Sequence, residues 1–549
     1  MSKINFQEAI VYEIHPQSFY DSNNDGIGDL QGIIQKLDYL TMLGVNYLWL
    51  NPIYFSPQKD NGYDVADYKK INPLFGTMAD FKKLISEAKK RNIYIMMDMI
   101  FNHCSIEHEW FQKVLVGNKD YEQRFFFLTG DKTIPPNNWQ SKFGGSVWEY
   151  HDKLQKFYLH LFDKTQIDLN WRDEKLRQDI YEIINYWLQE GVQGLRFDVI
   201  NLIGKPESFV DDLTGDGRKY YTDTPQVHTY LQEMGQKTYH MNNNIITVGE
   251  LSSTSIEQAI LYTKPESQEL NMAFTFHHLK IDYLNNDKWA LAAYEPAKLV
   301  TNIKEWQSLV QAEGGWLATF LNNHDQPRAL SRFGDPQNYR FESAIALAAV
   351  VLLLRGTPYL YQGEEFGMEN NNYQDINQLK DIESINYYYI LQQKGYEMSA
   401  ILKILSARSR DNARTPMQWS DEQFSGFSSH QPWINVNTNY LNVNWKKDYH
   451  NPQSIFKAYQ FLIQLRKKNL AFSYGQIDFL DLNPVVLSFY RSYQSQKFLV
   501  IINLSNQEIM VDDKIIDFKI IYNNYQTLDK KIKPYQVVIL DYLISKPFK

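Results

Sequence analysis

The chain has 549 residues and a formal net charge of −8 at pH 7, from 56 Lys and Arg against 64 Asp and Glu. An acidic balance without a basic run argues against binding to nucleic acid or anionic lipid. Aromatic residues make up 15% of the chain, which excludes a disordered protein. No stretch is apolar enough for a membrane helix, the amino terminus lacks a secretory signal pattern, and the one cysteine, Cys104, cannot form an internal disulfide. We therefore expect a cytoplasmic monomer with no membrane or nucleic-acid partner.

Eight short apolar runs recur in the first two thirds of the chain, and nearly all of them end at a charged or amide side chain. Stretches with helical periodicity separate most of these runs. Strands that alternate with helices are typical of βα units in a parallel sheet, and eight such units predict a closed (β/α)₈ TIM barrel of the α/β class. The expected strands lie at 9–16, 44–52, 92–103, 191–201, 244–250, 270–278, 315–325 and 357–365.

Two insertions and a later change of pattern divide the chain. Residues 104–172 are rich in Trp, Phe, Gly and Asn and follow the third expected strand, so we expect an inserted subdomain that walls the active-site face. A second insertion, at about 366–415, follows the eighth strand. Short alternating runs then predict a C-terminal antiparallel β-sandwich domain over 471–549. The catalytic barrel would comprise 1–103 and 173–470.

Carboxyl groups follow the ends of neighbouring expected strands and should meet at the carboxyl edge of the barrel. Asp198 and Glu250 suit glycoside cleavage, in which one carboxyl attacks the anomeric carbon and the other protonates the departing oxygen. The charge of Asp325 would stabilise an oxocarbenium-like transition state. Arg196 projects from the same strand face as Asp198, so we expect it to keep that carboxylate ionised.

Two histidines also follow strand ends. His103 and His324 could donate hydrogen bonds to sugar hydroxyls. A metal site built from these His and Asp residues is the rival interpretation. The chain contains no HExxH or comparable spacing of ligands, so the residues favour glycoside cleavage.

Four segments resemble the signature regions of the α-amylase superfamily, glycoside hydrolase family 13, and occur in that family's order. They are DMIFNH (98–103), GLRFDVIN (194–201), VGE (248–250) and NNHD (322–325). The resemblance covers essentially the whole chain and implies a retaining glycoside hydrolase. By position it implies that Asp198 is the nucleophile, Glu250 the acid/base and Asp325 the transition-state stabiliser, whereas Asp98 supports the structure of the site.

Within this family the chain resembles the oligo-1,6-glucosidase-like branch. DNGYDVADY (60–68) is similar to that branch's pocket for a non-reducing glucose, with Asp60 and Tyr63 as contacts. Arg410 is similar to the arginine that pairs with Asp60 and closes the pocket, which implies removal of one glucose from a chain end. Val199, directly after the implied nucleophile, is similar to the residue found in enzymes that avoid α-1,4 links.

Further segments, at 215–239, 248–255, 271–283 and 322–335, resemble members of the branch that hydrolyse α,α-trehalose 6-phosphate, a phosphorylated disaccharide. The sequence has no P-loop or other glycine-rich phosphate cradle, so basic side chains at the cleft mouth would have to meet the phosphate. The candidates are Lys280 and Lys288, with His278 and Arg328 behind them.

Three alternatives to this substrate stay open. The nearest is an oligo-1,6-glucosidase that takes a neutral second sugar, and the next is a sucrose isomerase on the same scaffold. The third is the non-enzymatic amino-acid-transporter heavy chain, which would need a membrane segment and eroded carboxylates. The groups at the outer sugar subsite discriminate between the enzymes, because a phosphate needs basic side chains.

The segment DSNNDGIGD (21–29) predicts a cation-binding loop. It alternates oxygen ligands with turn glycines, as in the first part of an EF-hand loop, and suits a structural Ca²⁺ or Mg²⁺. The ligands would be Asp21, Asn23, Asp25, the carbonyl of Ile27, and Asp29. The loop lacks the distal glutamate of an EF-hand, so a plain Asx/Gly turn is the alternative. We expect no cofactor for the chemistry itself.

Overall fold

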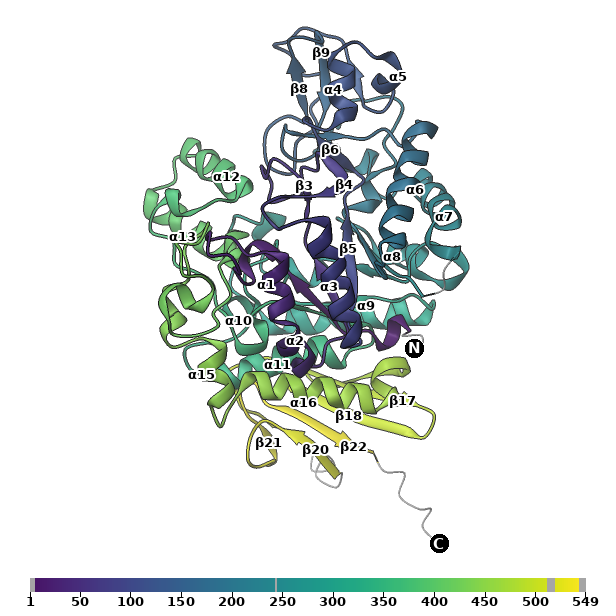
Figure 1. Ribbon diagram of the computed structural model, residues 1–549. Helices are drawn as coiled ribbons and strands as arrows, with labels where there is room; N and C mark the ends of the chain where they lie inside the picture. Colours follow the sequence, from purple (N-terminus) through teal and green to yellow (C-terminus); the bar gives the residue numbers. More distant parts are fainter. Residues whose placement is uncertain (1–4, 242–243, 511–518, 543–549) are drawn as a thin grey trace.

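The computed structural model describes residues 5–241, 244–510 and 519–542. Eight parallel strands form one sheet in the order β13-β12-β11-β5-β2-β1-β15-β14. A further parallel bridge joins Ala273 to Leu317 and brings the two edges of the sheet together. The expected (β/α)₈ barrel is therefore confirmed (Figure 1).

Each of the eight expected apolar runs contains one barrel strand. Almost every strand residue is buried, because one face of the sheet fills the barrel and the other packs against helices. The strands are β1 Val11–Ile14, β2 Tyr47–Leu50, β5 Tyr94–Met99, β11 Gly194–Phe197, β12 Ile246–Glu250, β13 Met272–Phe274, β14 Ala318–Thr319 and β15 Thr357–Tyr361.

Helices cover the outside of the barrel. Several begin at a side-chain cap, as where Thr77 accepts a hydrogen bond from the backbone N–H of Asp80. No helix in the described ranges is long and apolar enough to cross a membrane. The main helices are α1 Leu30–Gln35, α2 Leu37–Leu43, α3 Met78–Lys90, α6 Glu174–Gln189, α7 Pro225–Lys237, α8 Ile256–Thr263, α9 Pro296–Ala312, α10 Ala329–Phe333, α11 Arg340–Leu353 and α16 Ile455–Lys468.

The chain between β5 and α6 projects from one end of the barrel (Figure 1). An aromatic core holds this unit together, and Trp139 stacks on Tyr220 of the loop after β11 at 5.6 Å. The same core includes Val199, so its interior reaches the residue that follows Asp198. The elements of this unit are β6 His103–Ser105, α4 Glu109–Leu115, α5 Lys119–Glu122, β7 Phe127–Leu128, β8 Trp148–His151, β9 Lys156–Leu159 and β10 Gln166–Asp168.

A second group of helices follows β15, namely α12 Ile382–Gln393, α13 Met398–Arg408 and α14 Asp411–Arg414. Asn386 of α12 donates a hydrogen bond to the carbonyl of Phe143 at 3.2 Å. The two insertions therefore touch across the end of the barrel. A short hairpin of β3 Tyr54–Phe55 and β4 Asp67–Ile71 lies between β2 and α3.

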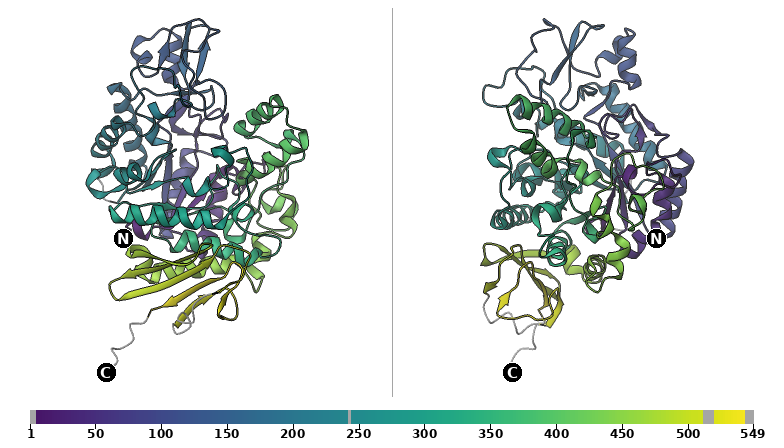
Figure 2. Two further views of the ribbon diagram at one scale, coloured as in Figure 1. Left: turned by 180° about the vertical axis from the view of Figure 1, so that it is seen from behind. Right: turned by 90° about the vertical axis from the view of Figure 1, so that its left-hand side faces the viewer.

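The C-terminal antiparallel sheet is also present, in the order β16-β17-β18-β22-β20, and it lies on the side of the barrel away from the inserted unit (Figure 2). A ribbon of β19 and β21 accompanies it. Parts of three expected strands, at 511–513, 515–518 and 543–544, lie outside the described residues. The elements are α15 Trp445–His450, α17 Leu470–Tyr474, β16 Gln476–Asn483, β17 Val486–Tyr493, β18 Gln496–Asn503, β19 Ile509–Met510, β20 Lys519–Asn523, β21 Lys531–Ile532 and β22 Val537–Asp541.

Two buried arginines join this sheet to the barrel. Arg466 of α16 donates to the carbonyls of Leu352 at 3.0 Å and Gly356 at 2.6 Å, and Arg491 of β17 donates to the carbonyl of Leu353 at 2.7 Å. These carbonyls lie at or just beyond the carboxyl end of α11, where the helix dipole is negative. Within the described ranges neither arginine has a carboxylate partner, and burial lowers the pKa of Arg466 to about 9.

Candidate active site

Three carboxyl groups share one guanidinium at the carboxyl ends of β5, β11 and β12. Arg196 Nη1 lies 2.6 Å from Asp98 Oδ1 and 2.6 Å from Asp198 Oδ1, and its Nη2 contacts Glu250 Oε2. Strand register explains the meeting, because Arg196 pairs with Asp98 in β5 and with Val248 in β12. Asp198 and Glu250 each lie two residues further along, on the same face. The structure brings these residues together as the sequence indicated.

One cation cannot balance three buried carboxylates, so the cluster keeps some of its protons. Burial raises the pKa of Glu250 to about 8, with a further increase from the Asp198 carboxylate, and raises the pKa of Asp98 to about 7. Burial also raises the pKa of Asp198, although Arg196 opposes it. We expected Arg196 to keep Asp198 ionised, and it does lower the pKa of Asp198, but burial raises that pKa by more. Glu250 is the group that stays protonated near neutral pH.

Asp325 has the opposite environment. Burial alone would raise its pKa, but His324, Arg410 and Arg414 together lower it below the usual range for an aspartate. Arg414 Nη2 lies 2.8 Å from Asp325 Oδ1, and Arg410 Nη1 lies 3.2 Å from the same oxygen. The site therefore holds one carboxyl that is protonated near neutral pH and one that is firmly ionised.

The inner end of the site is closed by ion pairs. Arg410 Nη2 donates to Asp60 Oδ1 at 2.8 Å, which is the expected pair, and to Asp381 Oδ1 at 2.6 Å. Gln166 Nε2 donates to the other oxygen of Asp60 at 3.1 Å. On the floor of the cavity the hydroxyl of Tyr63 donates to Asp98 Oδ2 at 2.8 Å.

A cavity of about 150 Å³ lies among these groups. Its lining combines carboxyl, amide, imidazole and cationic groups with aromatic rings, and such polar groups fix the orientation of a bound small molecule. Eight of the expected residues line it: Asp60, Tyr63, His103, Asp198, Glu250, Lys288, Asp325 and Arg410. The lining also includes Val199 and five residues that we did not expect, which are Phe143, Phe162, Gln166, Gln326 and Glu383.

Comparison with known proteins shows the family to which the chain belongs. The family described as alpha amylase, catalytic domain, matches residues 13–475. The chain belongs to the alpha-amylase family. It is 45% identical over 507 residues to the trehalose-6-phosphate hydrolase of Bacillus subtilis (strain 168), covering 92% of this chain and 90% of the relative. It is 42% identical over 557 residues to an oligo-1,6-glucosidase of Bacillus cereus, covering 98% of this chain and 99% of the relative.

A solved structure agrees with the fold as well as the family. The trehalose-6-phosphate hydrolase of Bacillus licheniformis is 44% identical, has a TM-score of 0.91 and covers 98% of this chain and 99% of its own. This alpha-amylase family member is therefore a glycoside hydrolase with a TIM barrel and a C-terminal antiparallel sheet. The transporter heavy chain, which we considered as a non-enzymatic alternative, is excluded.

Four expected residues do not line the cavity of this family member. Arg196 lies beneath it and acts through its carboxyl partners, and His324 stacks behind Tyr63 at 5.1 Å. Lys280 lies just after β13, beside rather than inside the cavity. The expectation for Arg328 is wrong, because this side chain is fully buried and its donors go to the backbone carbonyls of residues 362, 412 and 413.

Two expected residues that do line the cavity, Lys288 and His103, are held by contacts within the fold. Lys288 Nζ lies 2.6 Å from Glu383 Oε2, so its charge is compensated within the site. His103 Nε2 lies 3.1 Å from the carbonyl of Tyr63, and burial lowers the pKa of His103 to about 4. The neutral imidazole therefore uses its Nε2 hydrogen within the fold, which leaves it no second hydrogen for a sugar hydroxyl.

A buried ammonium connects the inserted unit to the barrel behind His103. Lys205 Nζ lies 2.7 Å from Asp168 Oδ1 and 2.6 Å from Asn102 Oδ1, and its side chain is completely buried. Asn102 Nδ2 in turn lies 3.1 Å from His103 Nδ1. The charge pair thus fixes the side of the cavity to which both β5 and β10 contribute.

The loop 21–29 has the geometry of a tight Asx-rich turn. Asp21 Oδ2 accepts hydrogen bonds from the N–H of Gly26 at 2.8 Å and from Ser428 Oγ at 2.6 Å. Gly26 has φ +89°, and a Cβ there would lie 2.2 Å from the carbonyl oxygen of residue 431. Asp29 caps α1 through the N–H of Gly32 at 2.7 Å.

This geometry tests whether the loop suits a cation. The ligand types and the glycine at the sixth position fit the start of an EF-hand loop. Both oxygens of Asp29 already accept hydrogen bonds from Ser22, and Asp29 Oδ1 also accepts one from the N–H of Gly32. In the described part of the chain no three His, Cys, Asp or Glu side chains form a group that could hold a metal ion. Asp21, Asn23, Asp25 and the carbonyl of Ile27 are the part of the loop that fits a cation.

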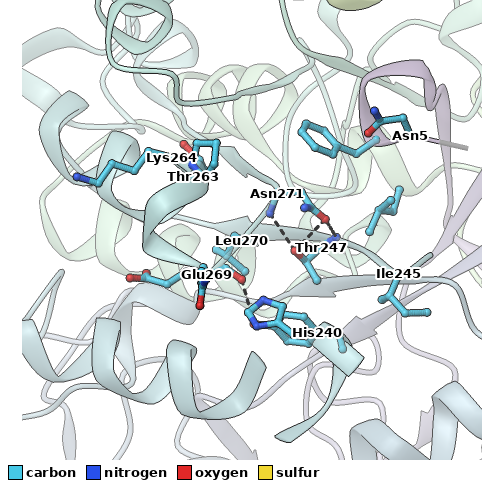
Figure 3. A pocket seen from close by; sticks show the side chains of 14 residues that line it. Asn5, His240, Ile245, Thr247, Thr263, Lys264, Glu269, Leu270 and Asn271 are labelled. Atoms are coloured by element: carbon cyan, nitrogen blue, oxygen red, sulfur yellow. Dashed lines mark hydrogen bonds between the residues drawn. The ribbon is translucent and has the colours of Figure 1, made fainter. Parts of the chain in front are cut away.

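A larger cavity, of about 490 Å³, lies at the opposite, amino end of β12 and β13 (Figure 3). Two of its polar residues, Thr247 and Asn271, pair with each other. Thr247 N–H donates to Asn271 Oδ1 at 2.8 Å, and Asn271 N–H donates to Thr247 Oγ1 at 2.9 Å. In a TIM barrel this end serves stability rather than chemistry, so the smaller cavity is the candidate active site.

The buried charge pair behind His103 gives a stability prediction. Replacing Lys205 by Met leaves Asp168 without its cation, so the free energy of unfolding should fall by about 3–5 kcal/mol in urea titrations. The double variant Lys205→Met with Asp168→Asn removes both charges and should recover much of that loss. A double variant that is no more stable than the single one would contradict the ion-pair explanation.

Proposed function

We propose that this glycoside hydrolase cleaves α,α-trehalose 6-phosphate to glucose and glucose 6-phosphate as a retaining, exo-acting α-glucosidase. Its similarity to the trehalose-6-phosphate hydrolases named above supports the choice. The ion pair of Asp60 with Arg410 in the cavity lining resembles the pair that closes the glucose pocket in the oligo-1,6-glucosidase-like branch, which supports removal of one terminal glucose. The proposal also includes a cytoplasmic location and a monomeric state. A single, buried cysteine fits the reducing compartment and does not bear on the oligomeric state.

The chemistry assigned to each carboxyl follows its environment. Asp198 attacks the anomeric carbon while Glu250 gives its proton to the departing oxygen, which yields glucose 6-phosphate and a glucosyl ester on Asp198. Water then attacks the ester, loses a proton to Glu250 and releases glucose. The raised pKa of Glu250 suits the acid role, and the lowered pKa of Asp325 suits stabilisation of positive charge at the anomeric centre.

The observation that carries the phosphorylated substrate is a cluster of three cations beside the cavity, Lys142, Arg218 and Lys280. Burial lowers the pKa of Lys142 to about 8, and the charges of Arg218 and Lys280 lower it further. Burial and Arg218 also lower the pKa of Lys280. Among the residues that the structure describes, the cluster has one carboxylate partner, Asp216, which binds Arg218. Three neighbouring cations with one carboxylate leave an excess of positive charge, which suits a phosphate.

The three residues of this basic cluster come from three parts of the chain, and Arg218 belongs to the segment after β11. Lys142 belongs to the inserted unit and precedes Phe143, which lines the cavity. Its ammonium lies 5.6 Å from the ring centroid of Tyr221, and that ring packs in one core with Val199 of the lining. Lys280 follows β13. Among the described residues, neither lysine makes an ion pair.

An oligo-1,6-glucosidase is the second candidate, since the Bacillus cereus relative matches nearly the full length of both chains. One structural feature favours it. Lys288, a lysine of the cavity lining, is paired with Glu383 at 2.6 Å, so it leaves no excess positive charge at that point of the lining. Turnover of isomaltose and of trehalose 6-phosphate by the same preparation decides between the two.

The acid/base assignment gives a pH prediction. Because Glu250 must carry a proton to act as an acid, kcat/KM for trehalose 6-phosphate should be retained below its pKa and lost as the pH rises through about 8. Glu250→Gln should lower kcat by about 10²–10⁴-fold for the disaccharide and less for p-nitrophenyl α-glucoside, whose leaving group needs no proton. Asp198→Asn serves as the control and should lower both rates. Equal losses for Glu250→Gln on both substrates would remove it from the acid role.

The basic cluster gives a prediction that discriminates between substrates. A charge-assisted contact contributes about 1.5–3 kcal/mol, so Lys142→Met or Lys280→Met should lower kcat/KM for trehalose 6-phosphate by about 10- to 100-fold. Both variants should spare p-nitrophenyl α-glucoside. Lys219→Met is the matched control, since this neighbouring lysine is paired with Asp212. If trehalose and its 6-phosphate are affected alike, the cluster serves the fold instead.

We also propose that the 21–29 loop holds a structural Ca²⁺ or Mg²⁺ on Asp21, Asn23, Asp25 and the carbonyl of Ile27. The fit of ligand type and spacing supports this, and the cation would have no part in the chemistry. Removing it with a chelator should lower Tm, since binding to the folded state alone stabilises by about 2.7 kcal/mol at a hundredfold excess over Kd. Asp25→Ala should abolish the shift. A Tm indifferent to chelator and to added cation would favour the plain turn.

A further inference from the structure

One buried carboxylate beside the active site binds two arginines from different parts of the fold. Arg332 of α10 makes a bidentate contact with Asp282, in which Nε lies 2.9 Å from Oδ2 and Nη2 lies 2.6 Å from Oδ1. Arg408, the last residue of α13, donates from Nη1 to Asp282 Oδ2 at 2.7 Å and from Nη2 to the carbonyl of Asp282 at 2.6 Å. The side chains of the three residues are 4%, 6% and 4% exposed, so salt screens these contacts little.

Asp282 belongs to the turn that carries Lys280, the member of the basic cluster that follows β13. The N–H of Tyr283 donates to the carbonyl of Lys280 at 3.1 Å and closes this turn. Arg332 Nη2 also donates to the carbonyl of Leu279. Arg332 therefore binds the chain on both sides of Lys280, at the residue before it and at the residue two positions after it.

The start of the same turn is fixed to the barrel. His278 Nε2 lies 2.8 Å from the carbonyl oxygen of Phe320, just after β14. The ring of His277 stacks on Trp306 of α9, with 4.5 Å between the ring centroids. These contacts hold the chain where it leaves β13, so the position of its far end depends on the arginines.

Both arginines also connect to the cavity, each through a different segment of its wall. Arg332 Nη1 donates to Gln326 Oε1 at 3.0 Å, and Gln326 lines the cavity. Arg408 lies two residues before Arg410, whose side chain is also part of the lining. The shared carboxylate therefore joins the lysine-bearing turn to two segments that line the cavity.

The place of the lysine matters because an ammonium binds a phosphate strongly only at short range. Such hydrogen bonds span about 2.7–2.9 Å, so a shift of about 1 Å in the turn would break one. The turn is held against such shifts, since moving Asp282 away would leave two buried guanidinium groups without their carboxylate.

We propose that Asp282 is a positioning residue for substrate specificity, which holds Lys280 at a fixed place relative to the cavity so that this lysine binds the phosphate of the second sugar. The proposal rests on the function proposed above and adds a residue to it. Asp282 does not line the cavity and acts only through the turn. Its loss should therefore weaken the use of the phosphate and spare the cleavage chemistry.

The ratio of kcat/KM for trehalose 6-phosphate to kcat/KM for trehalose measures the contribution of the phosphate. Asp282→Asn keeps the size of the side chain and removes the charge that the two arginines share. We expect this variant to lower the ratio by about 10-fold, as for one charge-assisted hydrogen bond, and to retain turnover of p-nitrophenyl α-glucoside. The fall should not exceed that of Lys280→Met, through which Asp282 acts. An unchanged ratio overturns the proposal.

A double variant separates positioning from a merely structural role. When Asp282→Asn is added to Lys280→Met, the ratio should show no further fall, because the lysine that Asp282 positions is already absent. Two effects that multiply overturn the proposal, since Asp282 would then act by another route.

Asp448→Asn is the matched control. Asp448 is a similarly buried carboxyl, but it binds Ser454 Oγ at 2.9 Å and the N–H groups of the first two residues of α16. This variant should leave the ratio unchanged even where Tm falls. The same fall in the control as in Asp282→Asn overturns the proposal.

Two further measurements apply if Asp282→Asn does not fold. Adding Arg332→Gln restores the net charge of the buried group, and this double variant should also lower the ratio. Crystals of the unmodified protein soaked in glucose 6-phosphate, the product, should hold the phosphate within hydrogen-bond distance of Lys280 Nζ, with both arginines on Asp282. The absence of phosphate from Lys280 overturns the proposal.

The wild-type ratio tells a failure of this proposal from a failure of the proposed function. A wild-type ratio close to one contradicts hydrolysis specific for the phosphorylated substrate, and this proposal with it. A high wild-type ratio that Asp282→Asn retains contradicts the role of Asp282 alone.

Discussion

The guanidinium of Arg196 is the group on which the arrangement of the cavity depends. It lies at the centre of three carboxyls from three strands, and strand register alone brings them to it. Bringing such charges together out of water is costly unless each is paired, and a single cation pairs them only in part. The carboxyls that are incompletely paired have raised pKa values, and the raised pKa of Glu250 is the one that suits an acid role. The cation that assembles the site therefore also leaves one of its acids protonated.

Buried cations that pair with carboxylates also hold the walls of the cavity in place. Arg410, from the chain after α13, bridges Asp60 of an early loop and Asp381 of the second insertion. Lys205 joins the loop after β11 to β10 of the inserted unit. Each buried cation connects segments that are far apart in sequence, and each bond would leave a charge unpaired if its segment moved away. The small cavity thus keeps its shape although loops make up most of its lining.

Much of the fold could be predicted from the sequence, because each barrel strand is a short apolar run that ends in a polar residue. The same pattern marked Asp198, Glu250 and Asp325, and the structure places them around one cavity. Gln166, by contrast, lies in β10 of the inserted unit, and nothing in its own sequence pattern assigned it to the lining.

Four of the five lining residues that sequence reasoning missed lie in the insertions, where no periodicity applies, and the fifth, Gln326, directly follows Asp325. Phe143 and Glu383 occur in irregular or helical segments whose positions depend on tertiary contacts. Arg328 shows the converse error, since a basic residue near a strand end was taken for a ligand contact when backbone carbonyls bind it. Burial decides such cases, and a single sequence does not record it. Of the cation cluster only Lys280 was expected, because Lys142 and Arg218 are distant from it in the chain.

The carbonyls that Arg466 and Arg491 bind have a consequence for cooperativity. They lie at the end of α11, between two barrel strands, whereas Arg491 belongs to the C-terminal sheet and Arg466 to the helix before it. Separating the sheet from the barrel would expose two cations and the polar groups that hold them at once, as well as the apolar faces between them. The two parts should therefore melt in one transition rather than two. Because the partners are carbonyls and not carboxylates, that coupling should persist at acidic pH, where ordinary ion pairs between domains fail.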